Sequence, residues 1–423
     1  MDLSKEGLLA SPIKDEDLQG EDFEPWHTQL YRSIDAKTAK FNAPIFKAKA
    51  FSDMEGVEYD EEKQAKAGKR KKMMQHILKT DKEKEQHFEG GDALNVEVAR
   101  ALDSKRELAV DCSVHKALVH HIRNAQHSIY IESQYFLSSS FLWPEKKTPT
   151  CCNLVAAEIA YKICEKIEAG QRFTTYIVLP MWPEGLPDSA SAQDILAYQA
   201  MTMSFMYKEI HNSIDRRRKH LNSRGDESLE NIKPTDYLNF YCLANRETKE
   251  GGHDKRVASG GILNRTRRHL VYTHSKLTIV DDAVVVCGSA NINQRSLDGS
   301  RDSELLMGSW QPNCTATKHD VAKGDIHGFR LHCWAHLMRT MDDKFRKPQS
   351  LDCVRLVNEI ARKNWSLYVQ EEPCDMESNL MPYPVKVKDD GSLEPLTENG
   401  KFPDTNSNIL GAKKVSLPKY LTT

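Results

Sequence analysis

The sequence lacks several features that mark whole classes of protein. Its ten cysteines include no Cys-x-x-Cys pair, which argues against a structural zinc site and against a disulfide framework. No apolar run approaches the roughly 20 residues of a membrane-spanning helix, and the first residues lack the apolar stretch of a secretory signal. Neither charge dominates, since 59 Lys and Arg face 61 Asp and Glu, so broad binding to nucleic acid is not expected. These absences favour a cytoplasmic globular protein.

What is present is a chain of 423 residues that divides into three segments by pattern. Residues 1–90 are highly charged, with an ordered patch at Trp26–Asp35 and a solvated or disordered insertion expected over residues 36–90. Residues 91–340 alternate helical and strand patterns, and residues 341–423 add a helix and a Pro-, Asp- and Asn-rich extension. The sequence therefore predicts an α/β fold with a mixed β-sheet flanked by helices, a mostly irregular N-terminal segment and a C-terminal extension.

The hydrophobic periodicity places the main elements. Helices are expected over residues 114–125, 156–167, 191–210 and 351–364, with Asp111 or Ser113 capping the first of them. Two basic runs, Arg216–Lys219 and Arg265–Arg268, are expected in polar loops. Strands are expected over Ser128–Phe136, Thr174–Leu179, Leu238–Leu243, Leu270–Val280 and Ala283–Gly288, the last two joined as a hairpin at Asp281-Asp282.

One strand carries residues suited to phosphoryl chemistry. Along an uninterrupted strand over residues 272–280, the period of two would place His274 and Lys276 on one face, with Leu277 and Ile279 on the opposite, core-facing side. The small and amide residues of Gly288-Ser-Ala-Asn291 follow the next strand and can lie beside that face. An ammonium and an amide stabilise a phosphoryl oxyanion, while an imidazole attacks phosphorus or moves a proton near neutral pH.

Carboxylates near this strand supply supporting roles. Asp281 stands at the end of the strand, and Glu304 or Asp302 is a candidate to fix the tautomer of the His274 ring. Ser289 and Asn291 are candidates for phosphate binding. This chemistry requires no metal ion.

The string His274-x-Lys276-x4-Asp281, followed by Gly-Ser-x-Asn, resembles the signature of the phospholipase D superfamily, the HKD motif. The similarity extends over about four fifths of the chain and is closest to plant-type phospholipase D. It includes IESQYFLSSSFLW within Asp111–Trp143, IVLPMWPEGLPDSASAQDIL from Tyr176 onward, YLNFYCLANRE at Tyr237–Glu247, the HGFR sequence at His327–Arg330, and the final residues Leu417–Thr423.

The resemblance implies a fold, a reaction and a set of site residues. Members of the family carry two HKD motifs that meet at one active site and hydrolyse phosphatidylcholine and related lipids to phosphatidic acid through a phosphohistidine. This chain contains one such motif, in the region of residues 269–296, and therefore resembles a C-terminal half. His274 would be the acid/base, Lys276 a phosphate anchor, Asp281 a support for the motif, and Gln134 a phosphate contact.

The resemblance also implies calcium, which plant enzymes bind with the help of a Glu in a Trp-Tyr-Glu-His-Leu stretch. Here the corresponding residues are Cys333-Trp-Ala-His-Leu337, with no Glu. Because Ca²⁺ prefers carboxylate oxygen, calcium binding by this half is not expected, and Glu132 and Asp302 are the remaining carboxylates to consider.

Three hypotheses remain open. The chain is part of a phosphatidylcholine-hydrolysing phospholipase D that is active only with its other half. Alternatively, it dimerises to bring two motifs together, as a one-motif phosphodiesterase or nuclease would. The third hypothesis is a non-catalytic binder of anionic lipid, which would use Arg216, Arg217, Arg218, Arg267 and Arg268. The first hypothesis is favoured, with a membrane phospholipid as substrate, peripheral membrane contact and no nucleic-acid partner.

Overall fold

The structure is a computed structural model and describes residues 26–35, 110–143, 151–248, 261–311, 314 and 322–412. The predicted insertion at 36–90 and the family-like residues Leu417–Thr423 lie outside this range. Within it, one large mixed sheet has the strand order β10-β5-β4-β3-β7-β8-β9-β1-β2, and β6 pairs with β5. The predicted α/β fold with a mixed sheet flanked by helices is confirmed.

The sheet joins a parallel core to antiparallel flanks. Strands β3 (Ser128–Glu132), β4 (Thr174–Val178) and β5 (Leu238–Arg246) run parallel, and β7 (Leu277–Val280) pairs antiparallel with β3. All other pairings are antiparallel. The remaining strands of this sheet are β1 (His27–Asp35), β2 (Val110–Cys112), β6 (Arg268–Val271), β8 (Val284–Gly288), β9 (Glu304–Trp310) and β10 (Leu380–Pro382).

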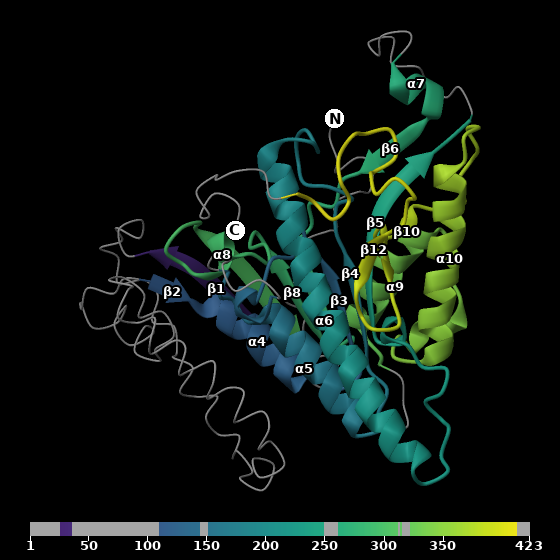
Figure 1. Ribbon diagram of the computed structural model, residues 1–423. Helices are drawn as coiled ribbons and strands as arrows, with labels where there is room; N and C mark the ends of the chain where they lie inside the picture. The colour runs from purple at the N-terminus through teal and green to yellow at the C-terminus, as the bar shows by residue number, and fades with distance from the viewer. Residues whose placement is uncertain are drawn as a thin grey trace, which may run out of the picture.

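Helices cover both faces of the sheet. On one face lie α4 (Ser113–Asn124), α5 (Val155–Glu168) and α6 (Ala190–Asn222), which run side by side in Figure 1. On the other face, α9 (Asp325–Met338) and α10 (Leu351–Val369) pack against Tyr130, Leu277 and Ile279. Since Val280 belongs to the first core and Leu277 to the second, both faces of β7 are buried.

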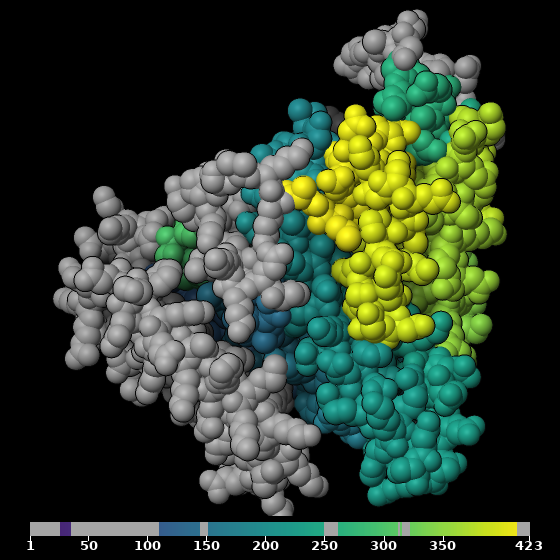
Figure 2. Space-filling model, viewed as in Figure 1, coloured from purple at the N-terminus to yellow at the C-terminus, as the bar shows by residue number. Residues whose placement is uncertain are grey.

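Up to residue 412, the C-terminal extension contains only short regular elements. It contains β10 and a small hairpin of β11 (Val385–Val387) and β12 (Leu393–Pro395). In Figure 2 this yellow segment lies along the surface between α6 and α10. Tyr383 Oη accepts a 2.9 Å hydrogen bond from Gln199, which fastens the segment to α6. The remaining short elements are α7 (Ile262–Thr266), α8 (Gln294–Leu297) and three 3₁₀ turns, η3 (Ser140–Leu142), η4 (Pro234–Asp236) and η6 (Asp343–Arg346).

Several predicted boundaries are wrong. The basic run Arg216–Lys219 lies within α6, because Arg and Lys are good helix formers and the solvent-facing Lys219 pairs with Asp215 one turn away. The second run is also structured, with Arg268 beginning β6 and Arg267 at the end of α7 in the left-handed region. Helix α10 extends to Val369. The N-cap position of α4 is Cys112, although the Asp111 carboxylate accepts a 2.9 Å hydrogen bond from the backbone N–H of Ser113, the first residue of the helix.

The expected strands differ in similar ways. Strand β3 ends at Glu132, and the expected strand Leu270–Val280 divides into β6 and β7 around residues 272–276, which lie beyond the end of the sheet. The hairpin at Asp281-Asp282 is confirmed, with both residues at a φ of 54°. Several elements had not been predicted, the longest of them being the helix α9 and the strand β9, apart from β1, which had been expected only as an ordered patch. In the described part of the chain no helix is long and apolar enough to cross a bilayer.

Candidate active site

The candidate site lies at the sheet edge where β3 and β4 end and β7 begins. Residues 272–276 precede β7 and are not part of a strand. The prediction that His274 and Lys276 share one face of a strand is therefore wrong. They are nevertheless close, since Lys276 Nζ donates a 2.6 Å hydrogen bond to the His274 carbonyl. The His274 side chain is exposed, which leaves its ring accessible to a substrate.

Gln134 is the centre of the polar cluster at this edge. Its Oε1 accepts from Lys276 Nζ at 3.1 Å and from Asn291 Nδ2 at 3.2 Å, and its Nε2 donates to Tyr272 Oη at 3.1 Å. Gln134 is only 8% exposed, so its amide is held in place. In the described part of the chain, the buried Asn291 Oδ1 has no hydrogen-bond partner. Gln134 and two segments more than 130 residues later in the chain thus bring a cation and amide groups to one point.

Burial and two nearby carboxylates affect the pKa of the Lys276 ammonium group. Partial burial lowers the pKa of Lys276, while Glu304 and Glu184 oppose that shift by favouring the ammonium form. Glu184 was not predicted as a site residue. Its position in the loop that follows β4 was the available signal, because loops at the carboxyl ends of parallel strands form binding sites.

The predicted phosphate contact Ser289 and the predicted orienting residue Glu304 are bonded to each other. Ser289 Oγ donates to Glu304 Oε2 at 2.5 Å, and Ser296 Oγ donates to Glu304 Oε1 at 2.8 Å. The alternative orienting residue, Asp302, pairs with Arg295 at 3.0 Å. Each Glu304 oxygen therefore already accepts a serine hydroxyl, and orientation of the His274 ring by Glu304 stays a prediction.

Asp281 lies at the opposite end of β7 from Lys276. Its carboxylate accepts hydrogen bonds from the backbone N–H groups of Gln126, His127 and Ser128 at 2.6, 2.6 and 2.9 Å. Burial raises the pKa of Asp281 above its usual value, although the three N–H donors oppose the shift. These contacts fix the turn between α4 and β3, so Asp281 positions the strand that leads to Gln134.

The neighbouring Asp282 was missed by the sequence analysis. Its carboxylate binds Arg330 Nε and Nη2 at 2.8 and 2.6 Å and His327 Nδ1 at 2.7 Å. Burial favours the protonated form, but Arg330 and His327 outweigh it and lower the pKa of Asp282. The pair Asp281-Asp282 and the HGFR sequence were visible signals, but only the fold shows that they meet.

The two basic runs do not form one surface. Along the 33-residue helix α6, Arg216 lies roughly 40 Å beyond the first residue, Ala190, at 1.5 Å per residue. Figure 1 shows the end of α6 and the α7–β6 segment at opposite ends of the molecule. Arg216 pairs with Glu168 and Arg218 donates to backbone carbonyls, while Arg268 binds Asp404 and the carbonyls that end α10. Arg217 lies beside Gly170.

Calcium is not supported by the donor set. In the described ranges no group of three His, Cys, Asp or Glu side chains converges on a point that could hold a metal ion. Glu132 Oε1 accepts from Tyr130 Oη at 2.5 Å, and Asp302 pairs with Arg295. The two carboxylates considered above are therefore engaged with other side chains, and no step below uses calcium.

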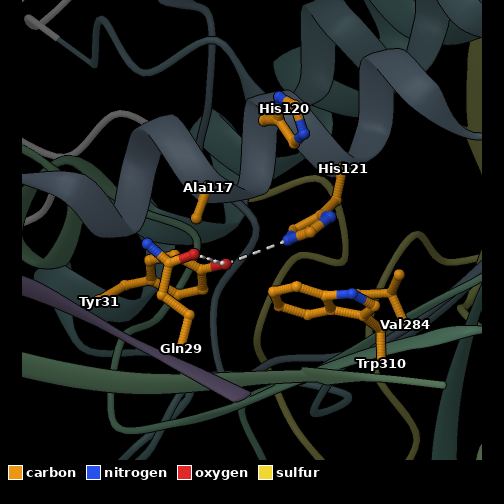
Figure 3. Close-up of a pocket in the computed structure, with 7 residues that line it drawn as sticks. All are labelled: Gln29, Tyr31, Ala117, His120, His121, Val284 and Trp310. Carbon is orange, nitrogen blue, oxygen red and sulfur yellow. Dashed lines mark hydrogen bonds between the residues drawn. The ribbon is translucent and has the colours of Figure 1, made fainter. Parts of the chain in front are cut away.

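A cavity of about 200 Å³ lies elsewhere, between α4 and the sheet (Figure 3). Tyr31 Oη lies 3.4 Å from His121 Nε2 inside it. Burial lowers the pKa of His121 to about 4 and raises that of Tyr31 to about 12, so both are neutral at physiological pH and offer no charge to a phosphate. The cavity is lined by Gln29, Tyr31, Ala117, His120, His121, Val284 and Trp310.

Comparison with known proteins identifies the family. The family model described as phospholipase D matches residues 52–411. The chain is 38% identical to phospholipase D alpha 1 of Oryza sativa subsp. japonica, over 100% of this chain and 45% of that protein. It is 45% identical to phospholipase D beta 1 of Arabidopsis thaliana, over 73% of this chain and 28% of that protein.

The chain thus spans less than half the length of these curated relatives. Among solved structures, the phospholipase D family member Nuc from Salmonella typhimurium aligns at 15% identity over 47% of this chain and 77% of its own, with a TM-score of 0.22. The family match over residues 52–411 and the identity to the two plant proteins establish that this chain belongs to the phospholipase D family.

Proposed function

We propose that this chain is part of a phospholipase D that hydrolyses phosphatidylcholine and related glycerophospholipids to phosphatidic acid and the free head-group alcohol. The observation that carries the proposal is the convergence of Lys276 and Asn291 on Gln134, beside the exposed ring of His274. A cation and amide groups held in a partly buried cluster are suited to a phosphodiester, because the ammonium offsets its negative charge and the amide N–H groups can donate to its oxygens.

In the proposed mechanism, His274 acts as the acid and then as the base. A histidine from a second motif attacks phosphorus, and the bond from phosphorus to the head-group oxygen breaks while His274 protonates that oxygen. His274 then takes a proton from water, whose oxygen attacks phosphorus and breaks the phosphorus–nitrogen bond. Phosphatidic acid leaves and both histidines are regenerated. Lys276 Nζ and Asn291 Nδ2 donate to the phosphoryl oxygens throughout, and Ser289, two residues before Asn291, is a further candidate contact.

The mechanism needs a second motif, and an apolar strip beside the site is a suitable surface for the unit that carries it. Leu30, Leu305 and Met307 are 56%, 51% and 43% exposed, and Leu30 and Met307 are direct neighbours across β1 and β9. The strip adjoins the site, because Ser289 N donates to the Leu305 carbonyl at 3.0 Å. Exposed apolar surface of this kind favours association. The partner unit is a second copy of this chain or a separate half with the first motif.

The same proposal includes peripheral contact with a membrane from the cytoplasm, since the substrate is a membrane lipid. Nucleic acid is the less favoured substrate because the chain has a net charge of -2 and its two basic runs are separated. The proposal includes no calcium ion.

The decisive experiment is choline release from phosphatidylcholine vesicles by the purified chain, with its mass measured by light scattering. The variant His274→Ala should abolish release, because no group remains to protonate the leaving oxygen. His269→Ala is the matched control, since His269 is an exposed histidine on β6 only five residues upstream. Equal and measurable release by wild type and His274→Ala, in the assembly that is active with wild type, would overturn the assignment of His274.

The partner requirement is tested with Leu30→Asp, which alters the apolar strip at a distance from Ser289. If two copies form the site, wild type elutes as an active dimer and Leu30→Asp as an inactive monomer. If wild type is an inactive monomer, release should appear on mixing with a separately produced unit that carries a first motif. Hydrolysis of bis(p-nitrophenyl) phosphate without choline release would favour a general phosphodiesterase. Vesicle binding without hydrolysis in any mixture would favour the non-catalytic lipid binder.

A further inference from the structure

We propose that the exposed face of helix α9 binds a transition-metal ion between His332 and His336. The two histidines stand four residues apart, and their Nε2 atoms are separated by 3.1 Å. Their ring centroids lie 4.5 Å apart with an interplanar angle of 77°. Residues four apart share one face of a helix, so the backbone itself brings the two nitrogens together. This site is separate from the phosphodiester chemistry proposed above.

The separation of the two nitrogens fits a shared metal ion. With metal–nitrogen bonds of about 2.0–2.1 Å, two ligands at a tetrahedral angle lie about 3.3 Å apart, and two ligands at a right angle lie about 2.9 Å apart. The observed 3.1 Å falls between these values. No change in the helix backbone is needed to place a metal ion between the rings.

The pair lies on the outer side of α9, where a metal ion can reach it. Both histidines are exposed, whereas Arg330 and Trp334 are buried on the inner side and serve the Asp282 contact and the core. One turn toward the start of the helix is Gly328, where a Cβ atom would meet nothing within 4 Å. The positions around the metal that the histidines do not fill are therefore open to solvent.

The donor set indicates which metals would bind. Imidazole nitrogen suits copper, nickel and zinc, whereas calcium and magnesium prefer oxygen ligands. In the described part of the chain no third His, Cys, Asp or Glu side chain joins the pair. Cys333, the nearest thiol in sequence, packs against the inner cluster, and burial raises its pKa to about 12. Water therefore completes the coordination, and affinity should follow the order in which Cu²⁺ exceeds both Ni²⁺ and Zn²⁺.

A hydrogen bond between the two rings would also give a short nitrogen–nitrogen distance, so the test must separate the two explanations. The complete chain, prepared without a histidine tag, is titrated with Cu²⁺ or Zn²⁺ in competition with a chromophoric chelator. His332→Ala and His336→Ala are compared with wild type and with His220→Ala. His220 is the matched control because it is an exposed histidine near the end of α6.

Either single substitution on α9 should weaken binding of one metal equivalent by about tenfold or more, because the second imidazole binds as an already tethered ligand. His220→Ala should bind as wild type does, and millimolar Ca²⁺ should not compete. Lower pH should release the metal, since protons compete for the imidazoles. Unchanged binding in both α9 variants would overturn the proposal and leave a hydrogen-bonded pair.

Two controls keep this result interpretable. Thermal unfolding without metal should be unaltered in both variants, because the side chains are exposed and their loss leaves no buried cavity. Metal addition should raise the melting temperature of wild type and of His220→Ala but not that of the α9 variants. Neither readout depends on choline release, so failure of this proposal is distinguishable from failure of the proposed function.

Discussion

The two ends of strand β7 belong to the same sequence signature and are built in different ways. At one end, Lys276 Nζ donates to the Gln134 amide oxygen and to the His274 carbonyl, and the His274 ring is exposed. Within the described ranges, Asn291 Oδ1 there has no hydrogen-bond partner. At the other end, Asp281 and Asp282 accept six hydrogen bonds or ion-pair contacts from backbone and side chains. The Lys276 end therefore keeps hydrogen-bonding groups available for a ligand, whereas the carboxylates at the Asp281-Asp282 end are already bonded and stabilise the fold.

This difference has a physical basis. A group that must bind substrate needs access and unused hydrogen-bonding capacity, so its own contacts contribute little to folding. A buried carboxylate must have all its partners, because an unpaired charge in the interior is costly. Substitutions at the two ends should therefore affect different quantities, namely activity at the Lys276 end and the free energy of unfolding at the Asp282 end.

The largest effect is expected from Asp282→Ala. Arg330 and Asp282 are 1% and 3% exposed at their side chains, so removing the carboxylate leaves a buried guanidinium without its partner. The free energy of unfolding should fall by about 3–5 kcal/mol, measured by chemical denaturation. The double variant Asp282→Leu with Arg330→Met should recover much of the loss, since it removes both charges. A loss below about 1 kcal/mol in Asp282→Ala would contradict this account.

The same pair predicts how stability depends on pH. The pKa of Asp282 is lower in the folded chain than in the unfolded chain. Its contribution is therefore present above the unfolded value of about 3.9 and is lost as the pH falls through the folded value. Denaturation midpoints measured from pH 6 downward should decline for wild type below about pH 4. In Asp282→Asn, the part of this decline that comes from protonation of Asp282 should be missing. If the midpoints of the two proteins depend on pH in the same way, the Asp282–Arg330 pair does not cause the decline.

At the other end of β7, Lys276→Met should affect activity and leave stability nearly unchanged. Loss of the cation should raise the activation free energy by about 3–4 kcal/mol, or roughly 10²–10³-fold in rate. Unfolding should change by no more than about 0.5 kcal/mol. Choline release is measured in the assembly that shows activity with wild type, and denaturation is measured in parallel. A loss of stability that matches Asp282→Ala would erase the distinction between the two ends.

Asp281→Ala should have an intermediate effect. Three backbone N–H groups would lose their acceptor, and water can reach this turn better than the Asp282 pair because Asp281 is only partly buried. The expected loss is about 1–3 kcal/mol. Asp281→Asn keeps an oxygen acceptor and should lose less. If instead Asp281→Ala abolished choline release without loss of stability, Asp281 would belong with the catalytic end.

The smallest effect concerns the basic runs at the two edges of the sheet. Arg267 directly precedes β6, next to the carboxyl end of β5, whereas Arg216 lies in the last two turns of α6 and pairs with Glu168. Arg267→Gln should weaken binding to anionic vesicles by about 1 kcal/mol, the usual value for one basic residue near a surface. Arg216→Gln should leave vesicle binding unchanged. Equal effects of the two substitutions on vesicle binding would show that the membrane does not bind preferentially at Arg267.

The sequence predicted the class of the fold and most of the long elements. The hydrophobic periodicity of the sequence was sufficient to predict α5, β4 and the hairpin of β7 and β8. It failed where local preference was ambiguous, as in the basic run that proved to be the end of α6. It also missed β9, whose exposed Leu305 and Met307 give no alternation of apolar and polar residues.

For the candidate site, sequence reasoning selected the residue types but could not assign their contacts. Gln134, Lys276 and Asn291 were named, and the fold brings them together. Glu304 was expected beside His274, but its recorded bonds go to Ser289 and Ser296. Asp282 was passed over although it holds the only ion pair to Arg330 among the described residues.

The sequence alone therefore determined the family signature, the α/β class and the set of polar residues available for chemistry. These depend on residue types and on spacings within a few residues. Only the tertiary structure decided which aspartate binds Arg330, where the two basic runs lie, and that Gln134 meets Lys276 and Asn291. The reason is that such contacts join residues about 50 to 160 positions apart, and strand order and register, not local preference, set their distance.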